Sequence, residues 1–319
     1  MSGRYAPMKP TLVGEPFSDP DWVFERKLDG ERCGALRHNG RVTLLSRTGR
    51  ELDAAYPEID DALAVSGPDL LVDGEIVAFA RGQTSFERLQ RRMQIRDRER
   101  ALRSRVPVFY YVFDLLELDG VDLRPLPLRE RKAKLRHVLL WGGRIRATAY
   151  RRGDGVSAFR EACRRGWEGV VAKHLTSPYV PKRSREWLKV KCAHGQELVI
   201  GGWTAPRGSR ERFGAILVGY YDRGALRYAG RVGTGFDGAA LQHLGDELER
   251  RERHSSPFTD GPPAGSAHWA EPELVAEIGF AEWTREGRLR QPRYQGLRDD
   301  KVAEEVVRET PSAIDGATR

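Results

Sequence analysis

A strand that ends in a lysine, followed by a tight turn and a hairpin, constrains this chain most. Residues 22–25 (Trp-Val-Phe-Glu) alternate as a strand does, and Lys27 stands at the end of that strand. Residues 29–30 (Asp-Gly) form a turn dipeptide, and glycine there lets the backbone come close to a ligand. The next strand pair, residues 33–47, contains Asn-Gly at 39–40, the strongest short hairpin signal. The stretch predicts an antiparallel sheet with Lys27 at its rim.

The residue types around Lys27 point to group-transfer chemistry. A lysine amine attacks an electrophile only when it is neutral, and an ordinary pKa of about 10.4 leaves almost none neutral at pH 7. Neighbouring cations lower such a pKa and free the lone pair. Arg32, five residues on, can clamp a phosphate or carboxylate with two hydrogen bonds. Taken alone, the stretch also fits a surface hairpin of ordinary charged residues.

Two further stretches place charged side chains within apolar strands. Residues 70–79 form an apolar run interrupted by Asp73 and Glu75. Burying a carboxylate costs several kcal/mol unless it has a partner or a ligand, so this pair of acids suggests a site. Lys189 and Lys191 alternate with apolar residues and therefore share one strand face. Two like charges side by side repel unless an anion lies between them, which predicts a phosphate site.

An arginine-rich stretch, residues 85–105, is predicted to form one long helix with a serine N-cap. Between residues 88 and 105 it holds eight arginines against two acids. Such a run forms either a solvated helix face or a face that contacts phosphates, and the sequence leaves both open. If it contacts phosphates, the candidates are Arg88, Arg91 and Arg92.

Composition narrows the class of partner. Lysine and arginine total 54 against 46 acids, for a net charge of +8 and a pI near 9.5. This balance favours an anionic partner, nucleic acid before membrane, although a basic protein without such a partner has the same balance. No apolar run approaches about 18 residues, and the first residues lack an apolar signal core, so we expect a soluble intracellular protein. The three cysteines lack metal-site or disulfide-framework spacing and are predicted to be unpaired structural residues in a reducing cytosol.

The pattern of elements divides the chain into two domains and a tail. Residues 1–20 are predicted to be an irregular, proline-containing lead within a first domain that covers residues 1–193. A polar hinge at 192–197 separates it from glycine-punctuated strands with one helix, residues 197–308, which fit a small barrel of the oligonucleotide-binding type. Residues 309–319 are expected to form a frayed C-terminal tail.

In their order along the chain, these fragments resemble the nucleotidyltransferase motifs of ATP-dependent DNA ligases. The resemblance covers nearly the whole chain and is closest to the ligase module of bacterial end-joining ligases of the D and C types. It implies an α+β fold, an ATP-grasp-like adenylation domain with antiparallel sheets followed by a C-terminal OB-fold β-barrel. The matching stretches are residues 25–32, 46–49, 73–75, 113–114, 168–173, 189–191 and 298–301.

The resemblance implies a covalent first step. Lys27 would attack the α-phosphorus of ATP, become Lys-AMP and release pyrophosphate, while Lys189 and Lys191 would grip the α-phosphate and lower the pKa of Lys27. Arg298 and Lys301 would swing in with the barrel to orient the leaving group, and the hinge would allow this movement. The catalytic residues implied are Lys27, Lys189, Lys191, Arg298 and Lys301.

The resemblance also assigns nucleotide, metal and DNA contacts. Glu25 would lie by the adenine edge, with Phe113 stacked on one adenine face and Val171 opposite. Carboxylates suit a hard cation, Mg²⁺ or Mn²⁺, for which Glu168 and Glu75 are the candidates. The cofactor-binding residues implied are Glu25, Arg32, Arg47, Glu75, Phe113, Val171 and Asp300; Arg32 and Arg47 would also contact the 5′-phosphate of a nick, beside Arg88, Arg91 and Arg92.

The implied function is ligation of 3′-hydroxyl and 5′-phosphate ends in nicked or broken duplex DNA, through Lys-AMP and a DNA-adenylate. It would serve repair and recombination by non-homologous end joining, as a monomer at the nucleoid in the bacterial cytoplasm, with a Ku-type end-binding protein as a further partner. Alternatives are an mRNA-capping guanylyltransferase, an RNA ligase or a non-catalytic nucleic-acid clamp. An NAD-dependent ligase fits less well, because a nicotinamide module and zinc cysteines are lacking. The preferred DNA substrate and metal stay open.

Overall fold

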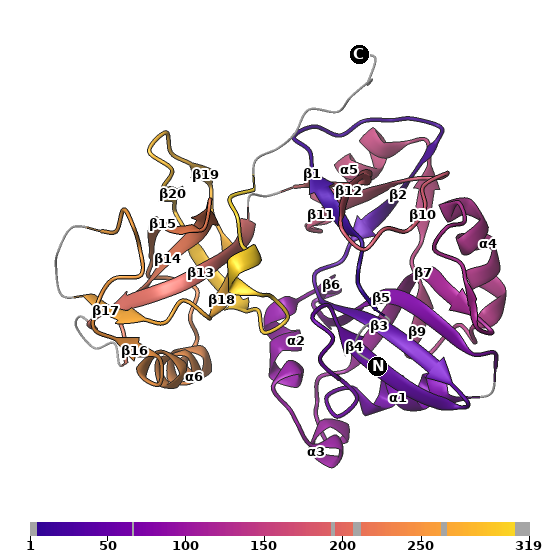
Figure 1. The fold of residues 1–319 in the computed structure, drawn as a ribbon, viewed down its shortest axis with the longest axis horizontal. Helices are drawn as coiled ribbons and strands as arrows, with labels where there is room; N and C mark the ends of the chain where they lie inside the picture. The colour runs from indigo at the N-terminus through magenta and orange to yellow at the C-terminus, as the bar shows by residue number, and fades with distance from the viewer. Residues whose placement is uncertain (1–4, 66, 193–194, 207–211, 263–266, 310–319) are drawn as a thin grey trace. The chain divides into compact units, whose positions relative to one another are not determined.

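The computed structural model describes residues 5–65, 67–192, 195–206, 212–262 and 267–309. It divides into two compact units, of which the first ends at Cys192 and the second spans Ala193–Glu309 (Figure 1). Residues 193–194 of the predicted hinge and residues 310–319 of the predicted tail lie outside the described residues.

One sheet of the first unit carries the lysine strand. Its strand order is β1-β12-β11-β2-β10, antiparallel except for the parallel pair β1–β12. Helix α5 covers one face, where Phe24, Val170 and Leu188 pack against Ala158. Side chains alternate across a strand, so the residues between these apolar positions point to the other face. The bounds are β1 Lys9–Leu12, β2 Trp22–Lys27, β10 Tyr150–Arg152, β11 Gly169–His174, β12 Arg183–Lys191 and α5 Gly155–Arg164.

The second sheet of this unit holds the predicted hairpin, with order β4-β3-β5-β7-β8, while β6 pairs with β5 and β9 with β7. Asn39 and Gly40 both have positive φ, as the two central residues of a type I′ turn require, which confirms the Asn-Gly prediction. Helices α1, α2 and α4 pack on this sheet. The bounds are β3 Glu31–His38, β4 Arg41–Ser46, β5 Leu70–Ala80, β6 Gln83–Thr84, β7 Val108–Leu118, β8 Val121–Asp122, β9 Ile145–Ala147, α1 Pro57–Ala64, α2 Phe86–Met93, α3 Arg98–Leu102 and α4 Leu128–Val138.

A small core joins the two sheets and includes the N-terminal lead. Phe113 of β7 and Trp187 of β12 pack together with Tyr5 and Met8. Tyr5 is 3% exposed and Met8 is fully buried. The prediction of an irregular lead over residues 1–20 is therefore wrong for its described part, which supplies β1 and buried side chains. No local pattern announced this, because β1 gains its partner from a strand more than 170 residues away.

The predicted long arginine helix is also wrong, since two short helices, α2 and α3, replace it. Helix α2 ends at Met93 with Gln94 as its C-cap. Asp97 then starts α3 as its N-cap, with its carboxylate accepting a hydrogen bond from the Arg100 amide at 2.7 Å. Aspartate favours the N-cap because its side chain satisfies an otherwise unpaired amide, and this local preference interrupts the helical run.

The second unit is built on an antiparallel sheet that curls around a long strand, β13. Strand β13 pairs with β14 along one edge. Along its other edge, the first half of β13 pairs with β18 and the last residues pair with β17. Helix α6 packs Leu244 and Leu248 into the core. This arrangement is the predicted OB-type barrel. The bounds are β13 Gly195–Thr204, β14 Ala215–Asp222, β15 Ala225–Val232, β16 Glu252–Arg253, β17 Ala267–Ala270, β18 Val275–Gly279, β19 Glu282–Trp283, β20 Leu289–Arg290, β21 Arg293–Leu297, α6 Gly238–Glu249 and a 3₁₀ turn Ala303–Glu305.

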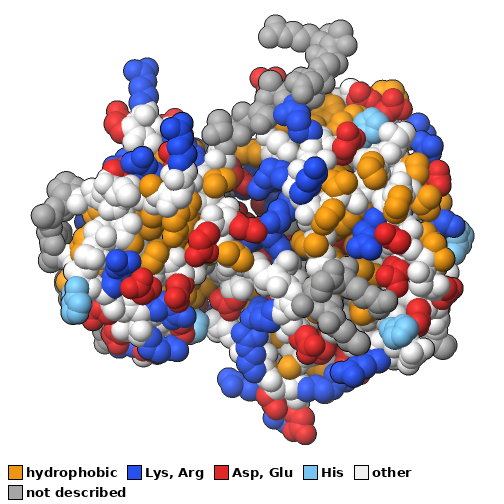
Figure 2. Space-filling view, in the orientation of Figure 1, with side chains coloured by type: hydrophobic (Ala, Val, Ile, Leu, Met, Phe, Trp, Pro, Cys, Tyr) orange, Lys and Arg blue, Asp and Glu red, His pale blue; other side chains and the backbone are white. Residues whose placement is uncertain are grey.

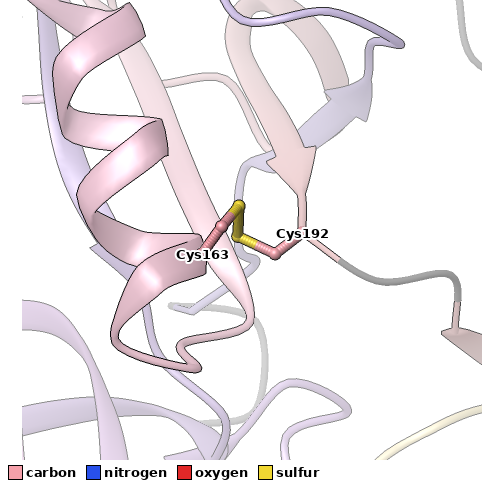
Figure 3. The surroundings of a disulfide bond; sticks show 2 residues. All are labelled: Cys163 and Cys192. Atoms are coloured by element: carbon pink, nitrogen blue, oxygen red, sulfur yellow. A yellow bond between two sulfur atoms is a disulfide. The ribbon is translucent and has the colours of Figure 1, made fainter.

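Two of the three cysteines form a disulfide, which corrects the prediction that all are unpaired. Cys163 in the last turn of α5 is bonded to Cys192, which follows β12 (Figure 3). Only Cys33 has a thiol, and it is buried. Their sequence separation of 29 gave no spacing signal, since the tertiary fold alone brings their Cα atoms to 5.2 Å.

Within the described ranges, no helix is both long and apolar enough to cross a membrane.

Candidate active site

The face of the first sheet opposite α5 gathers most of the predicted site residues. Lys27 and Lys191 both lie opposite Gly169, and Glu25 and Lys189 both lie opposite Val171. Residues directly opposite one another project to the same side of a sheet, so these four positions place three lysines and a glutamate on one face. Gly169 is required at its position, because its φ is +151° and an added Cβ would lie 2.0 Å from a backbone oxygen of β12. The predicted alternation of Lys189 and Lys191 is confirmed by the apolar packing of Leu188 and Val190 beside α5.

Lys27 is held by a carboxylate. Its amine lies 2.6 Å from the carboxylate of Glu168, and the two side chains are 21% and 27% exposed. Burial lowers the pKa of Lys27, and Lys191 lowers it further, but Glu168 and Glu75 raise it by more, so the net pKa lies above the ordinary value. The prediction that neighbouring lysines leave Lys27 with a lowered pKa is wrong for this arrangement. Glu168 directly precedes β11, and the pairing of β11 with β2 brings it to Lys27. Its carbonyl accepts a hydrogen bond from the Cys192 amide at 2.9 Å.

Arg32 is fixed by a fully buried aspartate. Its Nε and one terminal nitrogen each lie 2.6 Å from an oxygen of Asp73, a bidentate pair. Asp73 also accepts hydrogen bonds from the hydroxyls of Tyr5, at 2.8 Å, and Tyr179, at 2.6 Å. The guanidinium carbon of Arg32 lies 4.6 Å from the ring centroid of Phe113. Arg32 is therefore presented against the predicted adenine-stacking ring by a cluster that includes the N-terminal lead.

Glu25 has two partners that the sequence did not reveal. Lys132 of α4 and Lys173 of β11 both form ion pairs with the Glu25 carboxylate, the second at 2.7 Å. Burial raises the pKa of Glu25, but the two lysines lower it by more. Burial also lowers the pKa of Lys173 to about 8 despite the neighbouring Glu25. Lys173 could have been found from its register, since it lies two residues after Val171 on the same face; Lys132 had no such signal.

The ring of Phe113 has two cationic side chains over it, those of Arg32 and Lys173. It is 7% exposed, and the Lys173 amine lies 3.9 Å from its centroid. A positive charge over an aromatic face is attracted by the ring quadrupole. Val171, on the neighbouring sheet face, is half-buried. Stacking of adenine between Phe113 and Val171 stays a prediction.

The arginines predicted to contact DNA differ sharply in availability. Arg91 is exposed, and Arg88 and Arg47 are half-buried, Arg47 in the turn that follows β4. Arg92 is 1% exposed, with hydrogen bonds to both oxygens of Glu58 at 2.8 and 2.9 Å and to the Ala55 carbonyl. The prediction of Arg92 as a DNA contact is therefore wrong, because its guanidinium ties α2 to α1.

On the face shown in Figure 2, charge alone does not single out a DNA-binding surface. Lysine and arginine side chains are scattered over the visible surface of each unit and interspersed with acidic ones (Figure 2). The net charge of +8 therefore supports an anionic partner without locating it.

The predicted residues of the second unit form their own cluster. Asp300, which is fully buried, accepts two hydrogen bonds of 2.9 Å from Arg298. Arg298 also lies 3.6 Å from Glu277, and Lys301 lies 2.6 Å from Glu197. Asp300 thus holds Arg298 in position within this unit.

The first unit offers carboxylates suited to a divalent cation. Among the described residues no group of three or more metal-ligating side chains gathers. Glu168 and Glu75 both lie near enough to Lys27 to raise its pKa. Mg²⁺ is commonly held by one or two carboxylates together with substrate phosphates and water. The two glutamates fit such an ion.

Comparisons with known proteins agree over most of the chain. A family model described as "ATP dependent DNA ligase domain" matches residues 10–191, and one described as "ATP dependent DNA ligase C terminal region" matches residues 209–301. The multifunctional non-homologous end joining protein LigD of Pseudomonas aeruginosa is 39% identical over 96% of this chain and 37% of its own length. The multifunctional non-homologous end joining DNA repair protein LigD of Mycobacterium tuberculosis is 40% identical over 90% of this chain and 37% of its own length.

A solved structure agrees with the fold. Mycobacterial DNA ligase D, complexed with ATP and MES, matches with a TM-score of 0.67 and 36% identity, over 95% of this chain and 98% of that chain. The chain spans a little over a third of the length of the curated relatives named above, 37% in each case.

Proposed function

This chain belongs to the family of ATP-dependent DNA ligases, and we propose that it joins 3′-hydroxyl and 5′-phosphate ends in duplex DNA. The reaction would pass through a lysyl-AMP on Lys27 and then a DNA-adenylate. The observation that carries the proposal is the sheet face on which Lys27, paired with Glu168 at 2.6 Å, lies beside Lys189 and Lys191. A nucleophilic amine among cations suits the transfer of a phosphoryl group better than it suits passive DNA binding.

In the first step, the Lys27 nitrogen would form a bond to the α-phosphorus of ATP as the bond to the pyrophosphate oxygen breaks. The amine must first release its proton to solvent, and the pairing with Glu168 at 2.6 Å opposes this because that carboxylate raises the pKa of Lys27. A divalent cation on Glu168 and Glu75 would supply charge neutralisation for the phosphates. Lys189 and Lys191 would hold the α-phosphate in line with the amine, which is the positioning that this chemistry needs most.

The remaining nucleotide contacts are proposed as the family resemblance implies them. Adenine would lie beside Glu25 and between Phe113 and Val171, and the AMP phosphate would contact Arg32 and Arg47. The geometry that supports the role of Arg32 is its bidentate pairing with Asp73, which aims the guanidinium across Phe113. Once AMP is on the 5′-phosphate, the 3′-hydroxyl displaces it and the phosphodiester is closed.

The second unit is proposed to act in adenylation through Arg298 and Lys301, with Asp300 holding Arg298. We expect Arg298→Ala to lose at least about tenfold in Lys-AMP formation from ATP, because a pyrophosphate-orienting cation is removed, yet to seal a pre-adenylated nick normally. Asp300→Asn should show the same split more weakly. Equal loss in both assays would assign this cluster to another role.

The proposed substrate is nicked or broken duplex DNA, in repair and recombination by end joining. The support is that the two relatives named above are both bacterial proteins of non-homologous end joining. We further propose that the chain acts as a monomer at the nucleoid of the bacterial cytoplasm, where its DNA lies, with a Ku-type end-binding protein as a recruiting partner. Sedimentation of the chain, alone and with a Ku-bound DNA end, tests the monomeric state and the Ku-type partner.

The decisive experiment is incubation with α-labelled ATP, GTP or NAD plus Mg²⁺ or Mn²⁺, followed by denaturing electrophoresis. A protein band labelled by ATP alone, and chased by a nicked duplex into sealed product, is the expected result. Label from GTP would favour a capping guanylyltransferase, and an absence of label from every nucleotide would favour a non-catalytic clamp.

A further inference from the structure

We propose that the first unit contains a second anion site, a pocket that binds a small phosphorylated or other oxyanionic molecule. The pocket has a volume of about 260 Å³ and lies between α4, β2, β10 and the turn after β11. Its polar and charged lining residues are Asp21, Arg129, Lys132, Arg136, Tyr150, Arg152 and Thr176.

The pocket is distinct from the nucleotide site proposed above. Val23, which lines it, lies on the same face of β2 as Lys27 but four residues earlier, about 13 Å along the strand. Arg152 lies opposite Val23, and Tyr150 lies opposite Glu25. The buried Glu25 with its two lysine partners separates this end of the face from Lys27. None of the residues that would handle the nucleotide phosphates lines the pocket.

The charge of the pocket is strongly one-sided. Four cationic side chains line it against one carboxylate, Asp21. Among the described residues no carboxylate lies within ion-pair distance of Arg136 or Arg152, and Arg129 comes no closer than 4.0 Å to Glu130. Like charges that line one pocket repel each other. A bound oxyanion would remove that cost.

The donors are also built into the fold. Lys132 is 6% exposed and donates to the Phe113 carbonyl at 3.1 Å as well as to Glu25. Arg136 donates to the Tyr150 hydroxyl, and Arg152 donates through Nε to the Pro20 carbonyl at 2.9 Å, which leaves its terminal nitrogens for a ligand. The forked guanidinium matches an oxyanion with two parallel hydrogen bonds.

The size of the pocket selects a small ligand. Pockets for drug-sized molecules measure about 300–1,000 Å³, so this one is just below that range. It suits a single phosphate group with a few attached atoms. A duplex backbone would require an open, extended surface of cations instead of a compact pocket.

The test is thermal unfolding of the full chain in inorganic phosphate against chloride at constant ionic strength, with phosphate line broadening in ³¹P NMR as a second readout. We expect phosphate to raise the unfolding temperature of the first unit by about 4 °C at ten times its Kd. The double variant Arg136→Gln/Arg152→Gln should lose both effects. Arg136 and Arg152 are exposed, so the variant is expected to fold.

Two matched variants separate this pocket from other cations. Arg151→Gln removes the same charge from the neighbouring residue of β10, whose side chain pairs with Glu161 instead of entering the pocket, and should keep both effects. Lys189→Gln weakens the nucleotide site and should keep them as well. The proposal is overturned if the double variant responds like the parent chain, if Lys189→Gln alone abolishes the response, or if the parent chain shows none.

Discussion

Two carboxylates of the first unit, Asp73 and Glu168, carry the same charge but have opposite surroundings. Asp73 is fully buried and accepts four hydrogen bonds, two from Arg32 and one each from Tyr5 and Tyr179. Glu168 is 27% exposed at the beginning of β11 and is paired with Lys27. The difference separates a carboxylate whose oxygens are all satisfied by the protein from one that stays accessible to a ligand.

The cause is position along the strand. Asp73 lies in the interior of β5, where neither oxygen can reach water, so each has to be satisfied by the protein. Glu168 precedes its strand and keeps a solvent-facing side, where a ligand can replace or join its lysine. An acid within an apolar strand therefore indicates a polar network first, and a ligand site only where the structure leaves it accessible.

The largest effect is expected from Lys27→Ala. Removing the nucleophile should reduce Lys-AMP formation by at least about 10³-fold, while stability changes by less than about 1 kcal/mol because its partner is partly exposed. Labelled-ATP electrophoresis and denaturant unfolding measure the two quantities. Arg26→Gln is the matched control, since Arg26 projects to the opposite face, over Trp167, and should keep the adduct. A labelled AMP adduct on the Lys27→Ala variant would show that Lys27 is not the nucleophile.

Asp73→Asn is expected to act first on stability. It leaves the buried guanidinium of Arg32 without its charged partner, a loss of about 3–5 kcal/mol in the free energy of unfolding. Glu168→Gln should cost less than about 1 kcal/mol and act on adenylation instead. Urea unfolding of both variants measures the contrast. Similar stability losses in the two would erase the distinction between the carboxylates.

Tyr5→Phe and Tyr179→Phe probe the same cluster more gently. Each removes one hydrogen bond to a charged acceptor, which is worth about 1.5–3 kcal/mol. Arg32 should then be held less firmly, so the KM for ATP in adenylation is expected to rise several-fold with kcat little changed. Tyr111→Phe on β7 is the control, as Tyr111 lies outside the cluster. A fall in kcat with constant KM would contradict a positioning role for these hydroxyls.

The smallest effect is expected from Arg91, which is exposed, compared with its buried neighbour Arg92. Arg91→Gln should leave stability within about 0.5 kcal/mol and reduce the salt slope of nicked-DNA binding by about 1, if the exposed guanidinium contacts a phosphate. Arg92→Gln, one residue on, should lower stability and leave the slope unchanged, because Arg92 pairs with Glu58 inside the fold. Fluorescence titration at several salt concentrations measures the slope. An unchanged slope for Arg91→Gln would assign that face to solvent alone.

Much of the local structure, and the place of the candidate nucleophile in it, followed from the sequence. The Asn-Gly turn, the alternation that places Lys189 and Lys191 on one face, and the strands of the second unit depend on short-range preferences that are visible in neighbouring residues. The position of Lys27 at the end of a strand belongs to the same class.

Tertiary structure alone decided the partners of each charge. Asp73 receives Tyr5 and Tyr179, 68 and 106 residues away, and Cys192 meets Cys163 across 29 residues. Whether Arg92 contacts solvent or Glu58 is a matter of how α2 packs on α1. Likewise, the pKa of Lys27 depends on Glu168, 141 residues away in sequence, because electrostatic partners are set by distance in space and not by spacing along the chain.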